Sequence, residues 1–275
     1  MTIASRRRVY RGLFFAACIL FCVGLFASVP FLEGKIDMSL LKRSGSYFSE
    51  KLFGLKFDSP GAATWSALFS GLYSVLCLGY ILFSFRKTVS SEIFFFSFWA
   101  LAPAFENLRP LAFSLAAGGA PISLVFFLTR VILAGRTMGL LSFFCASLYA
   151  SGFHNEKLGS AAGLAAIISL ALAASLPLNT AVFETSMILR PGFYPSIKLL
   201  VALAGIAIVA DFVYASFQAG EAPYRVVALG SAAVLAGQAL VLSQWRPLLL
   251  VPGFILLYLG SWFIVSRLHA YYLWQ

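Results

Sequence analysis

Long runs of apolar residues constrain this chain more than any other feature of its sequence. The first run, residues 13–32, contains no charged residue. An α-helix rises about 1.5 Å per residue, so about twenty residues cross the ~30 Å hydrocarbon core of a bilayer. Similar runs, separated by short segments with polar residues, glycine or proline, follow at residues 61–85, 92–117, 121–153, 158–178, 196–217, 226–242 and 248–265. The pattern therefore predicts eight membrane-spanning helices.

The composition supports the same fold class. Only 11% of the 275 residues are charged and 61% are hydrophobic, whereas soluble domains carry roughly 25% charged residues. The sequence predicts an all-α polytopic transmembrane helix bundle forming a single integral membrane domain over residues 1–275. Its predicted parts are a first span at 13–32, an outer loop at 33–60, a seven-span bundle at 61–265 and a cytoplasmic tail at 266–275.

The first apolar run has a second interpretation. A basic segment at residues 5–11 precedes it, as in a secretory signal peptide, and cleavage of such a signal would leave seven spans. The run is long for a signal and no clean A-x-A cleavage site follows it. A retained first span is therefore favoured.

The distribution of positive charge sets the expected orientation. The formal net charge is +10, and the Lys and Arg residues are scattered among loops and helix ends. This scatter is typical of membrane orientation and excludes a nucleic-acid partner. The arginines of residues 5–11, the Arg86-Lys87 pair and the basic tail place both termini in the cytoplasm, in a multi-pass protein of the cell membrane whose first partner is the lipid bilayer.

The outer loop contains one amphipathic stretch. Phe48, Leu52 and Leu55 recur at helical spacing, with charged residues between them. This spacing predicts a short helix that lies on the outer membrane surface.

Five ionisable residues within the apolar runs are the candidate site residues. An ionisable group inside hydrocarbon is costly, so it marks a site, a pathway or an internal ion pair. Glu106 and Arg109 are three residues apart and share a helix face. Depth along the helices predicts two further pairs, Glu106 with Arg130 in the outer half and Arg136 with Asp211 in the inner half. The candidates are Glu106, Arg109, Arg130, Arg136 and Asp211.

Each candidate has a structural and a functional interpretation. Charge pairs between helices often serve only packing. Arg130 lies near the middle of a span, and a carboxylate or lipid phosphate bound in a cavity would explain it. Asp211 suits coupling to protons or cations. The region between Pro103 and Gly135, including Pro110, is where a break in a helix is expected.

Small residues at a spacing of four mark close helix approach. Gly159 and Gly163 form a GxxxG pattern, and the segment 233–237 repeats the spacing. Packing inside the bundle is the expected use, with a homodimer as the alternative.

The sequence lacks the residue patterns that several classes of function require. The two histidines, His154 and His269, lie near predicted cytoplasmic helix ends, so no haem, metal site or other cofactor is expected. No nucleophile-elbow, HExxH, Walker or EF-hand motif occurs. No catalytic residue is identified, and the sequence favours a protein that is not an enzyme.

The chain from Trp65 onward resembles the seven-helix sensor module of bacterial signalling receptors. The resemblance covers about three quarters of the chain and rests on its closely spaced spans, on the opening Gly71-Leu72-Tyr73-Ser74-Val75-Leu76 and on the basic turn Phe85-Arg86-Lys87. Such receptors usually carry an output domain after the last helix. Only residues 267–275 follow here, so the resemblance implies output through a cytoplasmic or membrane partner protein.

The favoured function is therefore signalling: a membrane protein that senses or binds an anionic or membrane-associated ligand and acts through a partner. The alternative is transport, by a small-solute or lipid carrier in which Asp211 and Arg136 form a gating pair. A membrane enzyme acting on lipid-linked substrates is the third interpretation.

Overall fold

Helices make up almost all of the computed structural model, which describes residues 3–36, 49–52, 55–85, 90–152, 158–218, 222–242 and 247–273. The all-α polytopic bundle predicted from the apolar runs is confirmed, because seven of the described helices are long and apolar enough to cross a membrane. They are α1 (Ile3–Leu32), α3 (Ser59–Ser84), α6 (Ile122–Ala150), α7 (Leu158–Ser175), α8 (Tyr194–Gln218), α9 (Ala222–Leu242) and α10 (Leu250–Leu273).

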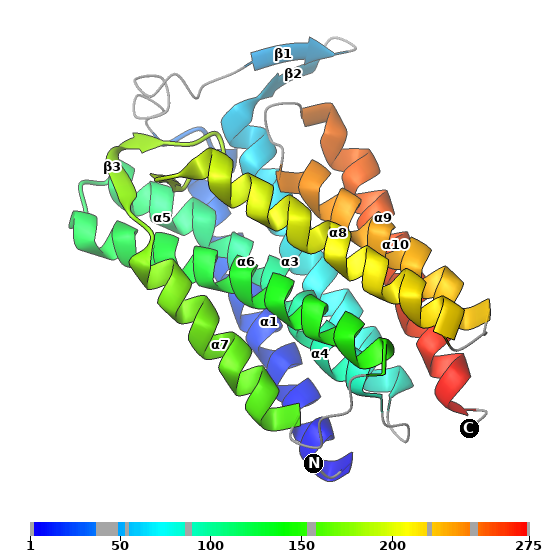
Figure 1. The fold of residues 1–275 in the computed structure, drawn as a ribbon. Coiled ribbons are helices and arrows are strands. Elements are labelled where there is room, and N and C mark those ends of the chain that lie inside the picture. Colours follow the sequence, from blue (N-terminus) through cyan, green and yellow to red (C-terminus); the bar gives the residue numbers. More distant parts are fainter. Residues whose placement is uncertain are drawn as a thin grey trace.

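A further crossing is made of three shorter pieces. Helix α4 (Ser91–Leu101) passes into the 3₁₀ segment η1 (Ala102–Asn107) and then into α5 (Leu108–Ala117), and together they run from one end of the bundle to the other (Figure 1). The break expected in this region occurs at Pro103, near the start of η1. Pro110 lies in the first turn of α5, and Gly135 lies inside the continuous helix α6.

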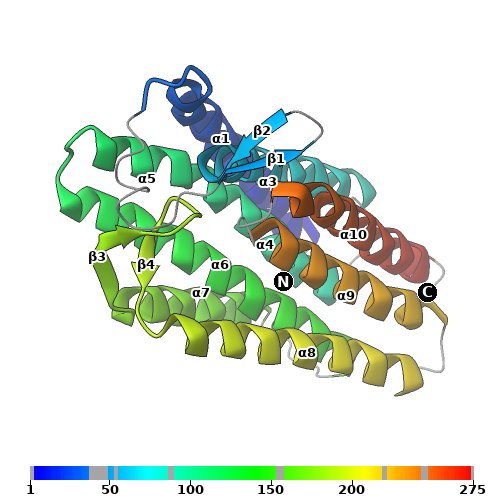
Figure 2. The same ribbon diagram turned by 90° about the horizontal axis from the view of Figure 1, so that it is seen from above.

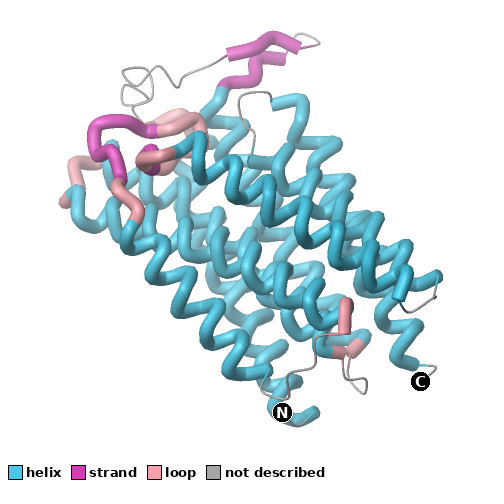
Figure 3. The backbone as a smooth tube through the Cα atoms, in the orientation of Figure 1, coloured by secondary structure: helices cyan, strands magenta, loops and turns pink. Residues whose placement is uncertain are grey.

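Both chain termini lie at one end of the bundle, which we call the terminal end (Figure 1). Two antiparallel hairpins lie at the opposite end, which we call the hairpin end (Figure 3). One pairs β1 (Ser49–Leu52) with β2 (Leu55–Asp58), and the other pairs β3 (Leu178–Phe183) with β4 (Leu189–Pro191). Helix α10 continues to Leu273, so most of the predicted tail is helical.

The surface helix predicted around Leu52 and Leu55 is wrong. These two residues face each other across the β1–β2 hairpin, and Phe48 lies outside the described residues. Apolar and polar residues alternate along β2, which is the period of a strand. The hairpin leads into α3, where the Asp58 carboxylate accepts a hydrogen bond from the Gly61 N–H at 3.0 Å and caps the helix.

Four glycines make room for η1 in the middle of the bundle. A β-carbon added at Gly24 of α1 or Gly71 of α3 would collide with the Asn107 side chain. On the other side, a β-carbon at Gly135 would lie 2.6 Å from the Phe105 ring, and one at Gly139 would collide with Ala102. The irregular segment therefore fits because three neighbouring helices lack side chains where they face it.

The two small-residue patterns differ in whether they pack against another helix. In α9, Gly237 packs directly on α10, where an added β-carbon would meet the Gly253 carbonyl oxygen at 2.7 Å. Gly230 and Gly260 form a second close approach between the same two helices. A β-carbon at Gly159 or Gly163 would meet nothing within 4 Å, so these two glycines do not mediate packing within the described chain. The homodimer alternative stays a prediction.

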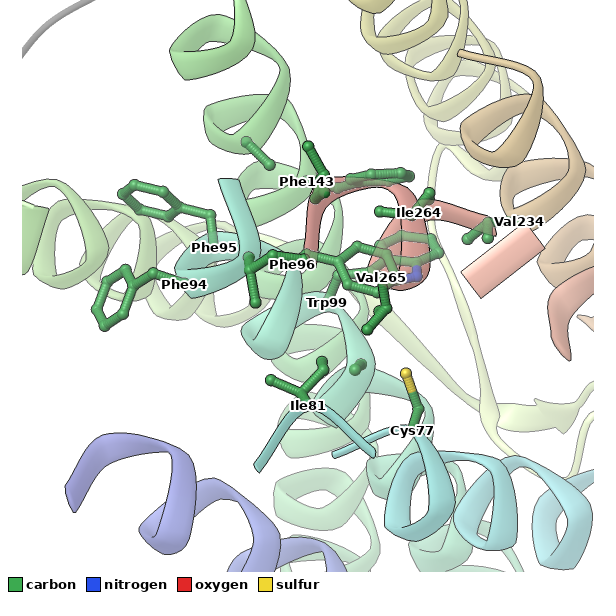
Figure 4. Packing of buried hydrophobic residues seen from close by; sticks show 14 of the residues in the cluster. Cys77, Ile81, Phe94, Phe95, Phe96, Trp99, Phe143, Val234, Ile264 and Val265 are labelled. Carbon is green, nitrogen blue, oxygen red and sulfur yellow. The ribbon is translucent and has the colours of Figure 1, made fainter. Parts of the chain in front are cut away.

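Aromatic side chains fill the bundle core beside α4. The centroid of the Phe143 ring lies 5.0 Å from that of Trp99, 5.5 Å from that of Phe96 and 5.9 Å from that of Phe212. Figure 4 shows Phe143, Trp99 and Phe96 close together. These rings join α4, α6 and α8 into one packed core.

Candidate functional site

Three charged side chains meet inside the bundle, and we call them the charged centre: Glu106, Arg109 and Arg136. Arg136 donates two parallel hydrogen bonds to the Glu106 carboxylate, from Nε to Oε1 at 2.7 Å and from Nη2 to Oε2 at 2.8 Å. Arg109 Nε lies 2.8 Å from Glu106 Oε2. Glu106 and Arg109 are fully buried, whereas the Arg136 side chain is 25% exposed.

The break in the α4–η1–α5 crossing positions this centre. Glu106 lies in η1 and Arg109 in the first turn of α5, so the change of helix type brings both to one side. The Asn107 amide donates to the Ala104 carbonyl at 3.0 Å and holds the turn. Ser66 of α3 accepts a hydrogen bond from Arg109 Nη2 at 2.8 Å. The centre thus joins the broken crossing to α3 and α6.

The charges of the centre do not cancel. One carboxylate faces two guanidinium groups, so the formal charge is +1 within an apolar bundle. An uncompensated buried charge is costly. Arg109 Nη1 is also buried without a hydrogen-bond partner. The centre therefore has both a spare positive charge and a spare donor, which suits an anionic oxygen.

Glu184, at the hairpin end, interacts electrostatically with Arg136 of the charged centre. It lies between β3 and β4, and its carboxylate interacts electrostatically with Arg136, Arg190 and Lys198. Ser186 Oγ donates to Glu184 Oε2 at 3.3 Å. Burial raises the pKa of Glu184 above its ordinary value, although the neighbouring cations and the Ser186 hydrogen bond act in the opposite direction. The sequence analysis did not identify Glu184, whose signal was that it is the only acid in residues 178–195.

The pairing of Glu106 with Arg109 is confirmed, but both pairs predicted from depth are wrong. Glu106 binds Arg136 instead of Arg130. Asp211 accepts a hydrogen bond from Ser147 Oγ at 3.0 Å instead of binding Arg136. The depth estimate failed because depth along a helix does not show which of its faces meets a neighbouring helix. Six residues also turn a helix by about 600°, so Arg130 and Arg136 point about 120° apart.

Arg130 stands apart from the centre. Its guanidinium lies over the Phe126 ring, 4.6 Å from the centroid. Its Nε is buried without a hydrogen-bond partner, and it forms no salt bridge among the residues that the structure describes. The aromatic contact supplies part of the compensation that an acid would give.

A second buried cluster, missed from the sequence, surrounds Glu92 near the terminal end. Its carboxylate accepts hydrogen bonds from Ser90 Oγ at 2.8 Å, from Tyr272 OH at 2.9 and 3.0 Å, and from Tyr224 OH at 3.2 Å. These bonds tie α4 to α9 and α10. This cluster was not predicted, because the linear sequence does not show that Glu92, Tyr224 and Tyr272 meet.

Within the described ranges, no three His, Cys, Asp or Glu side chains are grouped so that they could hold a metal ion. His269 packs its ring 5.1 Å from Phe85. His154, Arg86 and Lys87 lie outside the described residues.

Comparisons of this chain with models of known protein families, with curated proteins and with solved structures found no match. A functional assignment therefore depends on the geometry of the charged centre.

Proposed function

We propose that this multi-pass membrane protein binds an anionic group at the charged centre and transmits the change to a partner protein. The observation that carries the proposal is the excess of guanidinium over carboxylate inside the bundle. Arg109 Nη1 has no partner, and Arg136 is partly exposed. A carboxylate or phosphate would supply the missing negative charge and would match the bidentate geometry of arginine.

The position of Glu106 explains how binding would move the chain. An anion that competes with Glu106 for Arg136 loosens the contact between η1 and α6. Helix α4 continues directly into η1, and its other end is bound through Glu92 to Tyr224 and Tyr272. A shift of η1 is therefore transmitted along α4 to α9 and α10 at the terminal end. A partner docked at the terminal end would receive the signal, in line with the resemblance to seven-helix sensor modules.

The test uses the purified full chain in nanodiscs. Acetate and inorganic phosphate serve as soluble probes, with binding measured by calorimetry, and phosphatidylglycerol serves as a lipid probe, with bound lipid counted by native mass spectrometry. Arg136→Gln is expected to lose binding of the probe that the wild type binds. Arg225→Gln removes an exposed charge at the start of α9 and is expected to keep it. Equal binding by wild type and the folded Arg136→Gln variant would refute the proposal.

A carrier is the second candidate, and the interrupted crossing favours it. Substrate sites of many carriers lie near the membrane midplane, where a helix is broken. Asp211, held by Ser147 on α6, is the group for proton or cation coupling in that case. Proton-dependent uptake of a carboxylate into proteoliposomes, lost in Asp211→Asn, would support this candidate over the receptor. Absence of uptake by the wild type would exclude a carrier of the carboxylates tested.

A further inference from the structure

Two cations gather around one aromatic ring where α8 begins. The Nζ atom of Lys198 lies 4.2 Å from the centroid of the Tyr194 ring, and the guanidinium carbon of Arg190 lies 5.8 Å from the same centroid. Both cationic side chains are exposed, whereas Tyr194 is partly buried. We call Arg190, Tyr194 and Lys198 the cation clamp. Two like charges held at one ring repel each other, and a negative group bound between them would remove that repulsion.

The corner between β4 and α8 brings Arg190 back over the helix. It contains Phe193, whose φ of 55° is in the left-handed region that residues other than glycine rarely adopt. The Gly192 N–H donates to the Pro177 carbonyl at 2.7 Å, and this bond holds one side of the corner. The Ile197 N–H donates to the Phe193 carbonyl at 3.1 Å and holds the other side. Phe193 itself is exposed, as is usual for an aromatic residue at the interface between membrane and water.

The clamp carries more positive charge than its surroundings neutralise. Neither Arg190 nor Lys198 forms a salt bridge with an acid in the part of the chain that the structure describes. Glu184 interacts electrostatically with both, but it is shared with Arg136. One carboxylate opposite the two cations leaves a formal charge of +1 at the clamp. The first turn of α8 adds the positive end of the helix dipole. The clamp therefore suits a singly charged anion.

An apolar surface runs from the clamp toward the terminal end. Val201, Ala202 and Ile206 follow Lys198 by three, four and eight residues, so they share its face of α8. All three are exposed. Viewed from above, α8 forms one edge of the bundle, and its first turn lies beside the β3–β4 hairpin (Figure 2). In a bilayer this face of α8 meets acyl chains, and the clamp lies at the level where the span begins.

We infer that the cation clamp binds the phosphate of an anionic phospholipid, whose acyl chains lie along Val201, Ala202 and Ile206. Arginine and lysine are the usual partners of phosphate groups in proteins. The headgroup is net negative, because a zwitterionic headgroup would bring a third cation to the clamp. The lipid site is separate from the charged centre and does not depend on the function proposed for that centre.

The experiment counts lipids bound to the purified full chain by native mass spectrometry. Phosphatidylglycerol and phosphatidylcholine with the same acyl chains are titrated separately, and the dissociation constant of each is measured. The wild type is expected to bind one phosphatidylglycerol more tightly than phosphatidylcholine. Arg190→Gln and Lys198→Gln should each weaken phosphatidylglycerol binding about fivefold, the effect of one basic residue at an anionic lipid surface, and should leave phosphatidylcholine binding unchanged.

Lys35→Gln is the matched control, because it removes an exposed cation that pairs with Glu33 at the same end of the bundle. It is expected to leave the binding of both lipids unchanged. Equal binding of the two lipids by the wild type overturns the inference, and so does unchanged phosphatidylglycerol binding by the double variant Arg190→Gln/Lys198→Gln.

Inorganic phosphate tests whether the acyl chains take part. If it displaces phosphatidylglycerol at an equal concentration, the apolar surface contributes nothing and the lipid is not the ligand. Arg136→Gln separates the clamp from the charged centre, because this variant is expected to keep the lipid at the clamp. A bound lipid that is lost in Arg136→Gln and kept in Lys198→Gln belongs to the charged centre instead, so failure of one site is distinguishable from failure of the other.

Discussion

Replacing Glu106 with Gln is expected to destabilise the protein by about 3–5 kcal/mol. This is the usual cost of removing one partner from a buried ion pair, because the remaining charge is left uncompensated. In this chain the substitution removes the only carboxylate that contacts Arg109 and Arg136 within the described residues, including the two hydrogen bonds from Arg136. An ordinary hydrogen bond between membrane helices contributes only about 0.6–1.7 kcal/mol. Two such bonds contribute at most about 3.4 kcal/mol, so a loss above about 3.4 kcal/mol identifies the buried charge as the cause.

The assay is equilibrium unfolding in mixed micelles, with helicity followed against the fraction of denaturing detergent. Glu33→Gln is the matched control, because Glu33 pairs with Lys35 at 2.7 Å on the exposed surface. That change is expected to cost about 0.2–1 kcal/mol. The double variant Glu106→Gln/Arg136→Met should be more stable than Glu106→Gln alone, since it removes one uncompensated guanidinium. If Glu106→Gln costs no more than the control, the argument from buried charge is refuted.

Two further predictions follow from the structure, and a third follows from the distribution of Lys and Arg in the sequence. Gly71→Ala places a β-carbon against the Asn107 amide and should cost about 1–3 kcal/mol, whereas Gly163→Ala, with open space around it, should be neutral or slightly stabilising in the same unfolding assay. Tyr272→Phe removes the hydroxyl whose single proton is shared between the two oxygens of the Glu92 carboxylate. The change should cost about 1.5–3 kcal/mol, with faster amide exchange at the end of α10; Tyr214→Phe, exposed on α8, is the control and should change neither. Both termini are expected in the cytoplasm, so a fluorescent protein fused after Gln275 should be active and alkaline phosphatase fused there inactive; the reverse result would invert the orientation.

The apolar runs were sufficient to predict the helices because their length matches a bilayer. The first span ends at Leu32 and the broken crossing changes helix type at Pro103, both within the predicted regions. Local chemistry dictates these features: hydrocarbon demands a long apolar helix, and proline removes a backbone donor.

Which side chains pair inside the bundle depends on how the helices are rotated and packed against one another. The linear sequence does not contain this information. Arg136 and Arg130 differ by the rotation of α6, and the sequence does not show which face of the helix meets η1. The hairpins were missed because their strands are only three to six residues long, so their alternation does not stand out in the sequence alone. Gly135 illustrates the same limit: the sequence marked it as a possible break, but it serves to admit Phe105.

The broken crossing also has a consequence for how the chain enters the membrane. Each of Glu106 and Arg109 adds about 2.5–3.5 kcal/mol to the insertion of an isolated helix when it lies near the middle of the bilayer. Residues 91–117 are therefore poorly suited to leave the insertion machinery alone, and Arg136, which forms two hydrogen bonds to Glu106, is synthesised later on α6. The α4–η1–α5 segment would remain beside α1 and α3, where Gly24 and Gly71 leave room for it, until α6 has been synthesised. Assembly of this half of the bundle is then a single cooperative insertion event.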